Sequence, residues 1–583
     1  ATLAADYCLF LSSMSTTLSL SWIRRCAILC LFAAPHLAAQ DFVPPVDFKM
    51  LLSGTFGELR PNHFHSGIDI RTGGEEGKPI YSIAGGHVSR IFISPSGFGK
   101  AVYIDHPGGY TSVYAHLQAF EGEIAAYAEA RQYEKESFAI DVQVPAGRLK
   151  VSQGEVVARS GNSGTSGGPH LHFEIRDART EEPLDPMKQG IVIKDWIRPA
   201  IKSMKVYPEG PGSRVNDLTS PLTFPIHGWG PVHRLDLQDT LRVAGAVSFG
   251  LQVYDLLNES DNQNGVASIQ AYLDSLPFYA HSMERFAFSE TRYINSMIDY
   301  AEYRGSGKRF QRTRIDPNNR LRIYPDARLK GIIQPTPGIH TVRFVVTDHN
   351  DNQGILEFPI LVNPPLPAAE PACPGRILSW KTDHRIREEG MELSIPGEAL
   401  YDSICFSYSS GPGAQGTFGR LHRLNDERVP LHTHCTLRLE GSEVPVALRS
   451  RTLLVKVDAR GRRSDAGGQW EDGWVKGRIR EFGTYAIAVD TLAPRLAPLN
   501  FSEGGSMQGK SQLLIRLSDD LSGIASYRAE INGKWILMEY DAKVDLLILE
   551  VRPEQWLPGN NTLELSASDD AGNASKLTFN LIY

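Results

Sequence analysis

Two histidines and a glutamate alternate with apolar residues in the segment GPHLHFEI, residues 168–175. In a β-strand successive side chains point to opposite faces, so His170, His172 and Glu174 would share one face and the apolar residues the other. The apolar face is typical of a strand that packs on a core. The polar face needs another explanation, because imidazole and carboxylate groups bind zinc, and imidazole exchanges protons near neutral pH.

Two shorter segments supply further groups of these kinds. NHFHSGIDI, residues 62–70, places His65 four residues before Asp69, and YAHL, residues 114–117, contributes His116. Each segment alone is weak support for a metal site. Together they provide the ligands of a catalytic zinc, which uses three protein groups and one open position, and they leave two histidines for proton transfer.

Spacing alone does not divide the roles of the paired histidines. Side chains two residues apart on a strand are about 6.5–7 Å from one another. Either His170 or His172 can therefore bind a metal while the other faces the reacting group, and both can also bind it. Glu174 can support a ligand histidine or form a salt bridge to a neighbouring strand.

The elements around these residues must hold them in place. Residues 40–198 are dense in glycine and in short alternations of apolar residues, such as KPIYSIAGGHVSRIFIS and GKAVYIDHPGGYTSVYAHL. That pattern predicts antiparallel strands joined by glycine turns. An insertion at residues 121–147 interrupts the pattern, and its first half, rich in Ala, Glu and Arg, predicts a short helix.

Four motifs in this region resemble the lysostaphin-type (LytM-like) zinc metallopeptidases. They are HFHSGIDI, GKPIYSIAGGHVSRI, GFGKAVYIDHPGGYTSVYAHL and GNSGTSGGPHLHFEIRD, and they occur in the family's order over about residues 50–186. The resemblance implies a compact antiparallel β-sheet domain that binds one Zn²⁺ per chain. It also implies the zinc ligands His65, Asp69 and His172 and the catalytic pair His116 and His170.

The resemblance further implies a reaction. The family cleaves peptide bonds in bacterial peptidoglycan, so we expect a secreted endopeptidase that hydrolyses stem peptides or cross-links through a zinc-activated water. One alternative is a non-catalytic protein of the cell envelope that uses the same fold to bind or activate a hydrolase. Another is an adhesion or scaffold protein whose function lies in its other domains. Inactive relatives would be expected to lose ligands, whereas this chain has all five family residues, which favours the enzyme.

The rest of the chain carries an internal repeat. LQVYD followed by NGVASIQAYLD, within residues 251–274, resembles IRLSDDLSGIASYRAEING at 515–533. TVRFVVTDHNDNQGILEFPILV at 341–362 likewise resembles LELSASDDAGNASKLTFNLIY at 563–583. In each copy an alternating strand ends in Asp, turns through Asn and Gly, and a second strand follows. VDTLAP, residues 489–494, resembles the joint between bacterial immunoglobulin-like repeats.

These patterns predict a mainly β chain in which the peptidase domain precedes about three β-sandwiches. The predicted domains are a leader with a signal peptide at 1–39, the zinc metallopeptidase domain at 40–198, an immunoglobulin-like β-sandwich with a helical insertion at 199–364, a β-sandwich at 365–490 and an immunoglobulin-like β-sandwich at 491–583.

Two details of the first sandwich follow from its sequence. The helical insertion is SETRYINSMIDYAEY, residues 289–303, with a single apolar stripe made of Ile294, Met297, Ile298 and Ala301. The Asp- and Asn-rich segment SDNQNGVASIQA, residues 260–271, has Ser and Ala where the first and last ligands of a calcium-binding EF-hand loop should stand. It is predicted to be a plain turn.

The leader and the overall charge bear on compartment and partners. From Met14 the leader carries a basic pair, a short apolar run and small residues ending near Ala39, which is the pattern of a secretory signal peptide. It predicts export to the periplasm, the cell envelope or the medium, with no transmembrane segment after cleavage. The net charge of −7 argues against nucleic acid as the main partner. Peptidoglycan is the expected partner, together with envelope proteins that bind the immunoglobulin-like domains.

Three cysteines follow the leader, namely Cys373, Cys405 and Cys435. Export permits a disulfide, and three cysteines cannot all pair within one chain. The pairing that we considered is Cys405 with Cys435.

Overall fold

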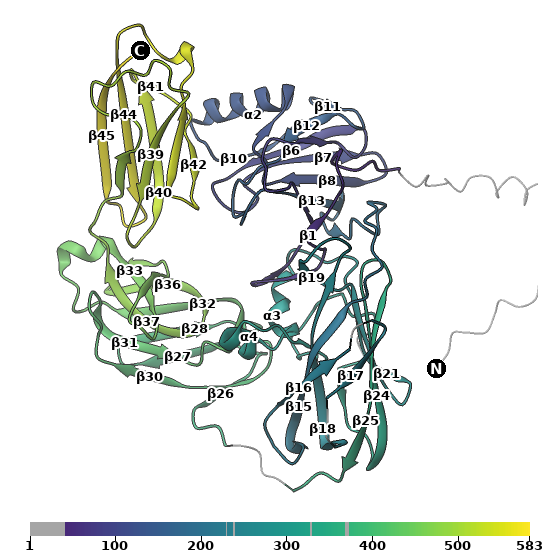
Figure 1. Ribbon diagram of the computed structural model, residues 1–583. Coiled ribbons are helices and arrows are strands. Elements are labelled where there is room, and N and C mark those ends of the chain that lie inside the picture. Colours follow the sequence, from purple (N-terminus) through teal and green to yellow (C-terminus); the bar gives the residue numbers. More distant parts are fainter. Residues whose placement is uncertain (1–40, 229, 237–238, 327–328, 368–371) are drawn as a thin grey trace, which may run out of the picture. The chain divides into compact units, whose positions relative to one another are not determined.

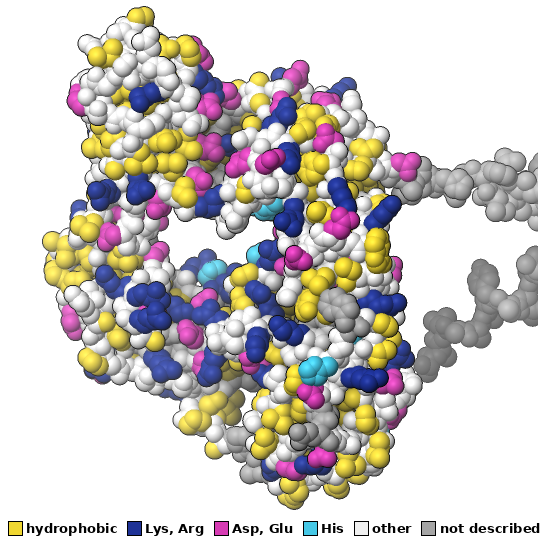
Figure 2. Space-filling view, in the orientation of Figure 1, with side chains coloured by type: hydrophobic (Ala, Val, Ile, Leu, Met, Phe, Trp, Pro, Cys, Tyr) yellow, Lys and Arg dark blue, Asp and Glu magenta, His cyan; other side chains and the backbone are white. Residues whose placement is uncertain are grey.

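A computed structural model describes residues 41–228, 230–236, 239–326, 329–367 and 372–583 (Figure 1). The predicted signal peptide lies outside these residues. Within the described ranges, the helices are too short or too polar to cross a bilayer. The face of the molecule drawn in Figure 2 carries acidic and basic side chains interspersed with one another.

The N-terminal part of the described chain is built on one nine-stranded antiparallel sheet, as the glycine-rich alternation predicts. Its strands, in spatial order, are β1 (Leu52–Gly54), β4 (Ile68–Arg71), β13 (His170–Asp177), β8 (Tyr110–Ala115), β7 (Lys100–His106), β6 (Gly86–Ile93) and β10 (Ile140–Gln143), with β11 (Lys150–Val151) beside β6 and β14 (Pro183–Leu184) beside β13. Two smaller sheets accompany it, made of β5 (Pro79–Tyr81), β12 (Val156–Arg159) and β9 (Ala119–Phe120), and of β2 (Leu59–Arg60) and β3 (His63–Phe64).

Strand β13 lies inside this sheet and is buried on both faces. Leu171, Phe173 and Ile175 are fully buried in the main hydrophobic cluster, which confirms the apolar face predicted from alternation. On the other face His172 and Glu174 are also buried. Polar groups shielded from water in this way must find partners within the protein.

The insertion after β9 begins with the predicted helix, α2 (Gly122–Lys135). Ile124 and Ala128 on one face of α2 are buried against the core of the same domain. The helix ends at Glu136, which adopts a left-handed backbone conformation with φ of 45°.

The next segment forms an eleven-stranded sheet. Its main path is β19 (Gln263–Asn264), β18 (Leu241–Leu256), β15 (Ala200–Val215), β16 (Leu222–His227), β17 (Val232–Leu235), β25 (Gln353–Asn363), β24 (Gly338–Thr347), β20 (Ser268–Leu273) and β21 (Leu276–Ser282), with β22 (Gln311–Arg312) and β23 (Ile332–Ile333) beside β18. Because β25 pairs with both β17 and β18, part of this sheet closes on itself around a hydrophobic core of its own.

The predicted helix at residues 289–303 is interrupted. The structure has η1 (Thr291–Tyr293), α3 (Ile294–Met297) and α4 (Tyr300–Ser306). The backbone becomes extended at Ile298, and the Asp299 carboxylate then caps α4 by accepting a hydrogen bond from the backbone N–H of Glu302. A single stripe was therefore the wrong expectation, and Ala301 is exposed because α4 starts a new helix with a different buried face.

Two further segments are β-sandwiches, because in each of them separate sheets, three in the first and two in the second, contribute to one hydrophobic core. The first contains β26 (Arg376–Leu378), β27 (His384–Glu388), β28 (Met391–Ile395), β29 (Ile404–Phe406), β30 (Tyr408–Gly411), β31 (Phe418–Leu424), β32 (Pro430–Glu440), η2 (Val446–Arg451), β33 (Thr452–Val457), β34 (Arg463–Asp465), β35 (Gln469–Glu471), β36 (Trp474–Glu481) and β37 (Gly483–Val489). The second contains β38 (Arg495–Pro498), β39 (Gln512–Ser518), β40 (Ile524–Ile531), β41 (Lys534–Trp535), β42 (Glu539–Asp541), β43 (Leu546–Glu550), η3 (Pro553–Gln555), β44 (Asn560–Asp569) and β45 (Ala574–Ile582). The domain boundaries and the immunoglobulin-like topology inferred from the sequence stay predictions.

The cysteines pair differently from the expectation. Cys373 and Cys405 form a disulfide, and Cys435 is free and buried. Pairing of Cys405 with Cys435 is therefore wrong. Strand β26 pairs with β29, with Ile377 opposite Cys405, so the segment before β26 brings Cys373 to Cys405. Cys435, on β32, instead packs its side chain into the hydrophobic core.

Thiol labelling under non-reducing conditions checks this pairing. In the chain from residue 41 onward we expect no rapid labelling in the folded state, because Cys435 is buried and burial raises its pKa to about 12. Unfolding should expose one reactive thiol per chain, and Cys435→Ser should remove it. Labelling of Cys373 in the unreduced, unfolded protein, located by peptide mass spectrometry, would contradict the assignment.

Candidate metal centre

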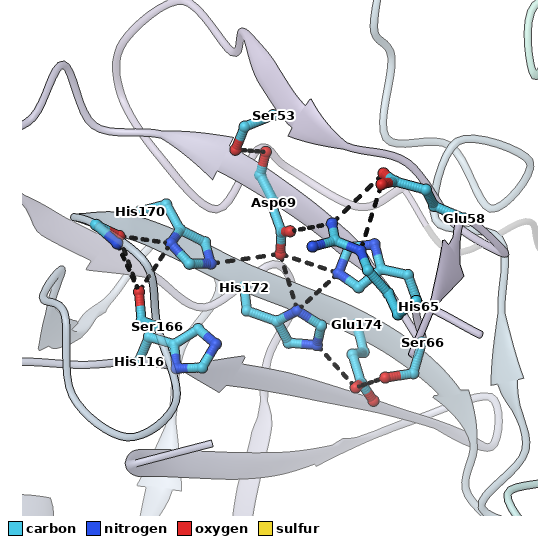
Figure 3. A network of polar contacts seen from close by, with 12 residues as sticks. Ser53, Glu58, His65, Ser66, Asp69, His116, Ser166, His170, His172 and Glu174 are labelled. Atoms are coloured by element: carbon cyan, nitrogen blue, oxygen red, sulfur yellow. Dashed lines mark hydrogen bonds and ion pairs between the residues drawn. The ribbon is translucent and has the colours of Figure 1, made fainter. Parts of the chain in front are cut away.

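Three neighbouring strands bring the predicted site residues together. β13 pairs with β4 on one side and β8 on the other, and His172 lies opposite Asp69 of β4 and Ala115 of β8. His116 directly follows Ala115 and so reaches the same end of the sheet. His65 directly follows β3 of the short β2–β3 hairpin. All five predicted side chains lie close together in Figure 3.

Three of these side chains converge on one point. The distance from His65 Nε2 to Asp69 Oδ1 is 2.9 Å, that from His172 Nδ1 to Asp69 Oδ1 is 3.0 Å, and that from His65 Nε2 to His172 Nδ1 is 3.0 Å. All three residues are buried. They are the set for which the sequence resemblance implies a zinc ion.

His65 and His172 each make one hydrogen bond on the side of the ring away from Asp69. These bonds determine which ring nitrogen carries a lone pair towards Asp69. His65 Nδ1 lies 2.8 Å from the Thr55 carbonyl oxygen, and His172 Nε2 lies 2.9 Å from Glu174 Oε1. Carbonyl and carboxylate oxygens accept hydrogen bonds, so these two nitrogens carry protons. In the neutral imidazoles the inward nitrogens then present lone pairs to one another and to the Asp69 carboxylate, an arrangement that requires a cation between them.

The arrangement fits a divalent metal. Nitrogen and oxygen ligands at tetrahedral angles, each about 2.0–2.1 Å from a zinc ion, lie about 3.4 Å from one another. The observed separations of 2.9–3.0 Å are close to that spacing. Two imidazoles and one carboxylate also form a donor set that zinc uses in catalytic sites.

When no metal is bound, a proton can occupy the space between His65, Asp69 and His172. Burial alone would raise the pKa of Asp69, but the adjacent His65, His170 and His172 hold that pKa well below its ordinary value. Burial alone would lower the pKa of His172, but hydrogen bonds with Asp69 and Glu174 raise it to about 9. At neutral pH the Asp69 carboxylate is therefore ionised and His172 carries the proton that a metal would replace.

The remaining two histidines, His116 and His170, form a pair beside this cluster. Their Nδ1 atoms donate hydrogen bonds to the carbonyl oxygens of Ser163, at 2.9 Å, and Gly168, at 2.8 Å, so in the neutral form of each ring Nε2 carries the lone pair. The ring centroids of His116 and His170 are 4.8 Å apart. His170 Nε2 also lies 3.5 Å from Asp69 Oδ1.

His116 combines a shifted pKa with a rare backbone conformation. Burial, followed by the charges of His172 and His170, lowers its pKa to about 3, so the imidazole is neutral at pH 7. Its φ is 57°, in the left-handed region that residues other than glycine seldom occupy. Strain of this kind concentrates at functional sites.

A second group of polar residues supports the candidate ligands, and the sequence left most of it unassigned. Glu174, which is fully buried, contacts His172 through Oε1 and Arg176 through Oε2, the latter at 2.5 Å. It therefore supports a histidine and also forms a salt bridge, but with its own strand rather than a neighbour. Ser66 donates to Glu174, and Arg60 pairs with Asp69 Oδ2 at 3.0 Å. The alternation that places His170, His172 and Glu174 on one face continues to Arg176, a signal that could have identified this ion pair.

The sequence matches known families in two places. Residues 63–132 and 139–186 match peptidase family M23, and residues 375–490 match a Zu5-like domain. Residues 63–186 form a peptidase family M23 domain. Such a domain implies a bound metal, and His65, Asp69 and His172 are residues of this M23 domain that can hold one.

The curated relatives match about a fifth of the chain. The chain is 32% identical over 129 residues to a Haemophilus influenzae protein named "Uncharacterized metalloprotease", and 32% identical over 127 residues to the DD-carboxypeptidase/endopeptidase Mpg of Neisseria meningitidis serogroup B. Each alignment covers 22% of this chain, and they cover 21% and 23% of the two relatives. The chain thus spans about a fifth of the length of these relatives. Among solved structures, a mutant catalytic domain of the M23 protein EnpA from Enterococcus faecalis is 25% identical and matches with a TM-score of 0.17, over 23% of this chain and 87% of that domain.

Metal binding to the M23 domain should release a proton. The pKa of His172 is about 9 in the metal-free protein, so at pH 7 a metal that binds Nδ1 must displace one proton. We expect about one proton released per zinc at pH 7, and an affinity that falls as the pH is lowered below about 9. Calorimetric titrations in buffers of different ionisation enthalpy measure this number. Zinc uptake without proton release at pH 7 would contradict the protonation assigned to His172.

Glu174→Gln tests the support of His172. The variant keeps the shape of the side chain but removes the charge that accepts from His172 and pairs with Arg176. Loss of such a hydrogen-bonding partner behind a metal ligand lowers affinity about 10- to 100-fold. The exposed Glu76, changed to Gln, is the matched control. Competition titrations with a chromophoric chelator measure both variants, and an unchanged zinc affinity in Glu174→Gln would show that Glu174 does not tune the site.

Proposed function

We propose that the protein is an exported zinc-dependent endopeptidase that hydrolyses peptide bonds in peptidoglycan stem peptides or cross-links. The observation that carries this proposal is the convergence of His65 Nε2, Asp69 Oδ1 and His172 Nδ1 within 3.0 Å, with two further histidines beside them. A purely structural cluster would not need so many imidazoles with inward lone pairs. The membership of residues 63–186 in family M23 supports the same reaction class.

In this proposal His65, Asp69 and His172 hold the metal. A bound zinc ion would supply Lewis acidity to the scissile carbonyl and lower the pKa of a water molecule. Glu174 and Thr55 fix the orientation of the two ligand imidazoles through their outer nitrogens. The buried Arg176 keeps Glu174 ionised, since the pKa of Glu174 is lowered to about 2 although burial alone would raise it.

The pair His116 and His170 would move protons. Each directs its Nδ1–H to a backbone carbonyl, so in the neutral form of each ring the Nε2 lone pair can accept a proton from an attacking water. Once protonated, the same nitrogen can donate to the oxyanion or to the leaving amine. The two histidines are close enough to divide these roles between them.

The substrate class and the compartment are extensions of the family assignment. The Neisseria relative is named a DD-carboxypeptidase/endopeptidase, which supports a substrate with D-amino-acid peptide bonds for this M23 domain. The predicted signal peptide supports export to the compartment that holds peptidoglycan.

Digestion of purified peptidoglycan by the zinc-loaded protein, with mass spectrometry of the released fragments, tests the proposal. His65→Ala and His172→Ala should lose both the metal and the activity, because each removes a ligand. His116→Ala and His170→Ala should retain zinc but lose about 10²- to 10⁴-fold in rate, the usual contribution of general acid–base catalysis.

His63→Ala is the matched control, because His63 is exposed and two residues from His65. It should keep the zinc content and the cleavage rate of the unchanged protein. Full activity in His172→Ala, or in protein freed of metal by a chelator, would exclude a metallopeptidase. Zinc retention with no fragments released from any peptidoglycan type would favour a non-catalytic binding role.

A further inference from the structure

A second cluster of acidic groups lies outside the M23 site. Asp195 belongs to the segment that joins the M23 domain to β15, Asp255 is near the end of β18, and Asp348 directly follows β24. One carboxylate oxygen of each lies within 4.8 Å of those of the other two. Three segments that are distant in sequence therefore bring three carboxyl groups to one place.

Asp255 has no hydrogen-bond donor for its charge. The residue is 1% exposed, and neither of its carboxylate oxygens has a hydrogen-bond partner. Oδ2 of Asp195 is likewise buried and unpartnered. An ionised carboxylate without partners in a protein interior is strongly unfavourable, so the arrangement requires either protonation or a cation.

The surroundings supply no cation of their own. In the described part of the chain, none of the three carboxylates forms an ion pair with Lys or Arg, and His349 beside Asp348 directs its Nδ1 to Asp185 instead. Burial, followed by the charges of Asp348 and Asp195, raises the pKa of Asp255 to about 8. The pKa values of Asp195 and Asp348 are also raised, chiefly by burial.

Amide oxygens complete a set of oxygen donors. Asn264 of β19 lies directly opposite Asp255 in an antiparallel pair, so the two side chains share a face of the sheet. It is 3% exposed, and its Oδ1 has no hydrogen-bond partner. The Oδ1 of Asn350 is also buried and unpartnered. Carboxylate and amide oxygens without sulfur or imidazole form the donor set that Ca²⁺ prefers.

The cluster also ties the joining segment to the sheet behind it. Asn352 donates from Nδ2 to the backbone oxygen of Asp195 and to Asp348 Oδ2. Asn350 donates from Nδ2 to the backbone oxygen of Ile193. An ion held by the three carboxylates would add direct bonds between the same segments.

The internal repeat seen in the sequence contains a related cluster, and the difference between the two is informative. Asp490, which directly follows β37, is grouped with Asp519 and Asp569 of the C-terminal sandwich. Asn573 bridges the backbone of Asp490 and the Asp569 side chain, as Asn352 does for Asp195 and Asp348. There, Ser522 donates to the Asp490 carboxylate from both its backbone and its hydroxyl, and backbone N–H groups donate to Asp519 and Asp569. Backbone N–H groups likewise donate to Asp195 and Asp348 in the first cluster, so the two clusters differ at Asp255, whose carboxylate oxygens have no hydrogen-bond partner.

We propose that Asp195, Asp255 and Asp348, with Asn264, bind a calcium ion that fixes the segment between the M23 domain and β15. The site is separate from the zinc site and does not depend on the peptidase activity. Sites in exported proteins bind calcium at about 10⁻⁴–10⁻³ M, which sets the range to be searched.

The test is a calcium titration of the full, zinc-loaded protein in buffer passed over a chelating resin. We expect saturable binding in calorimetry and a rise in the unfolding temperature with CaCl₂, larger than with MgCl₂ at equal concentration, because Mg²⁺ requires a smaller, stricter coordination shell. Asp255→Asn should weaken binding at least about 100-fold, and it should fold without calcium because it removes a buried repulsion. The control variant Asp261→Asn changes an exposed residue between β18 and β19. It should bind calcium as the unchanged protein does.

Limited proteolysis provides a second readout, which measures the effect of calcium on each protein separately. Lys194 is exposed and precedes Asp195, so calcium should slow tryptic cleavage after Lys194 in the unchanged protein but not in Asp195→Asn. Absence of binding up to about 10 mM CaCl₂, well above the range for exported calcium modules, would overturn the proposal. So would an Asp255→Asn variant that binds calcium as tightly as the unchanged protein.

Discussion

The pairing of β13 with β4 and β8 is the constraint on which the candidate centre depends. His172 lies opposite Asp69 across one edge of β13, and Ala115, which precedes His116, lies opposite His172 across the other. A shift of one residue in either pairing would turn the side chains of β13 to the other face of the sheet and place Leu171 or Phe173 where the histidine stands. The fully buried Leu171, Phe173 and Ile175 oppose that shift, because their apolar face cannot be exchanged for the polar one.

The burial of both faces of β13 explains why the site needs a second layer of charges. His172 and Glu174 are shielded from water as fully as the apolar residues between them. Glu174 can remain ionised there because Arg176, His172 and Ser66 all contact its carboxylate. The result is a chain of paired charges that begins at Arg176 in the interior and ends at the point where the three candidate ligands meet.

Alternation was sufficient to predict the strand, its core face and the polar face that carries the site, because side-chain direction along a strand follows from local geometry. Alternation was not sufficient to divide the roles of His170 and His172, because that division depends on the neighbouring strand. In the structure only His172 has its Nδ1 beside both His65 and Asp69, whereas His170 directs its Nδ1 to a backbone carbonyl. The broken helix at Ile298–Asp299 and the Cys373–Cys405 disulfide were missed for a related reason. The disulfide depends on a partner that is remote in sequence. The helix breaks because a local cap at Asp299 competes with the helical period.

Glu174 and Asp255 show the two ways in which this protein treats a buried carboxylate. Both are almost completely buried, yet the pKa of Glu174 is lowered to about 2 and that of Asp255 is raised to about 8. Burial disfavours the charge in each case, so the difference lies in the neighbours. Glu174 faces Arg176 and His172, whereas Asp255 faces two further carboxylates. The chain provides charged partners for the buried Glu174 on β13 but none for the buried Asp255 on β18. Without a cation Asp255 therefore holds a proton at pH 7, and the proposed calcium ion would displace it.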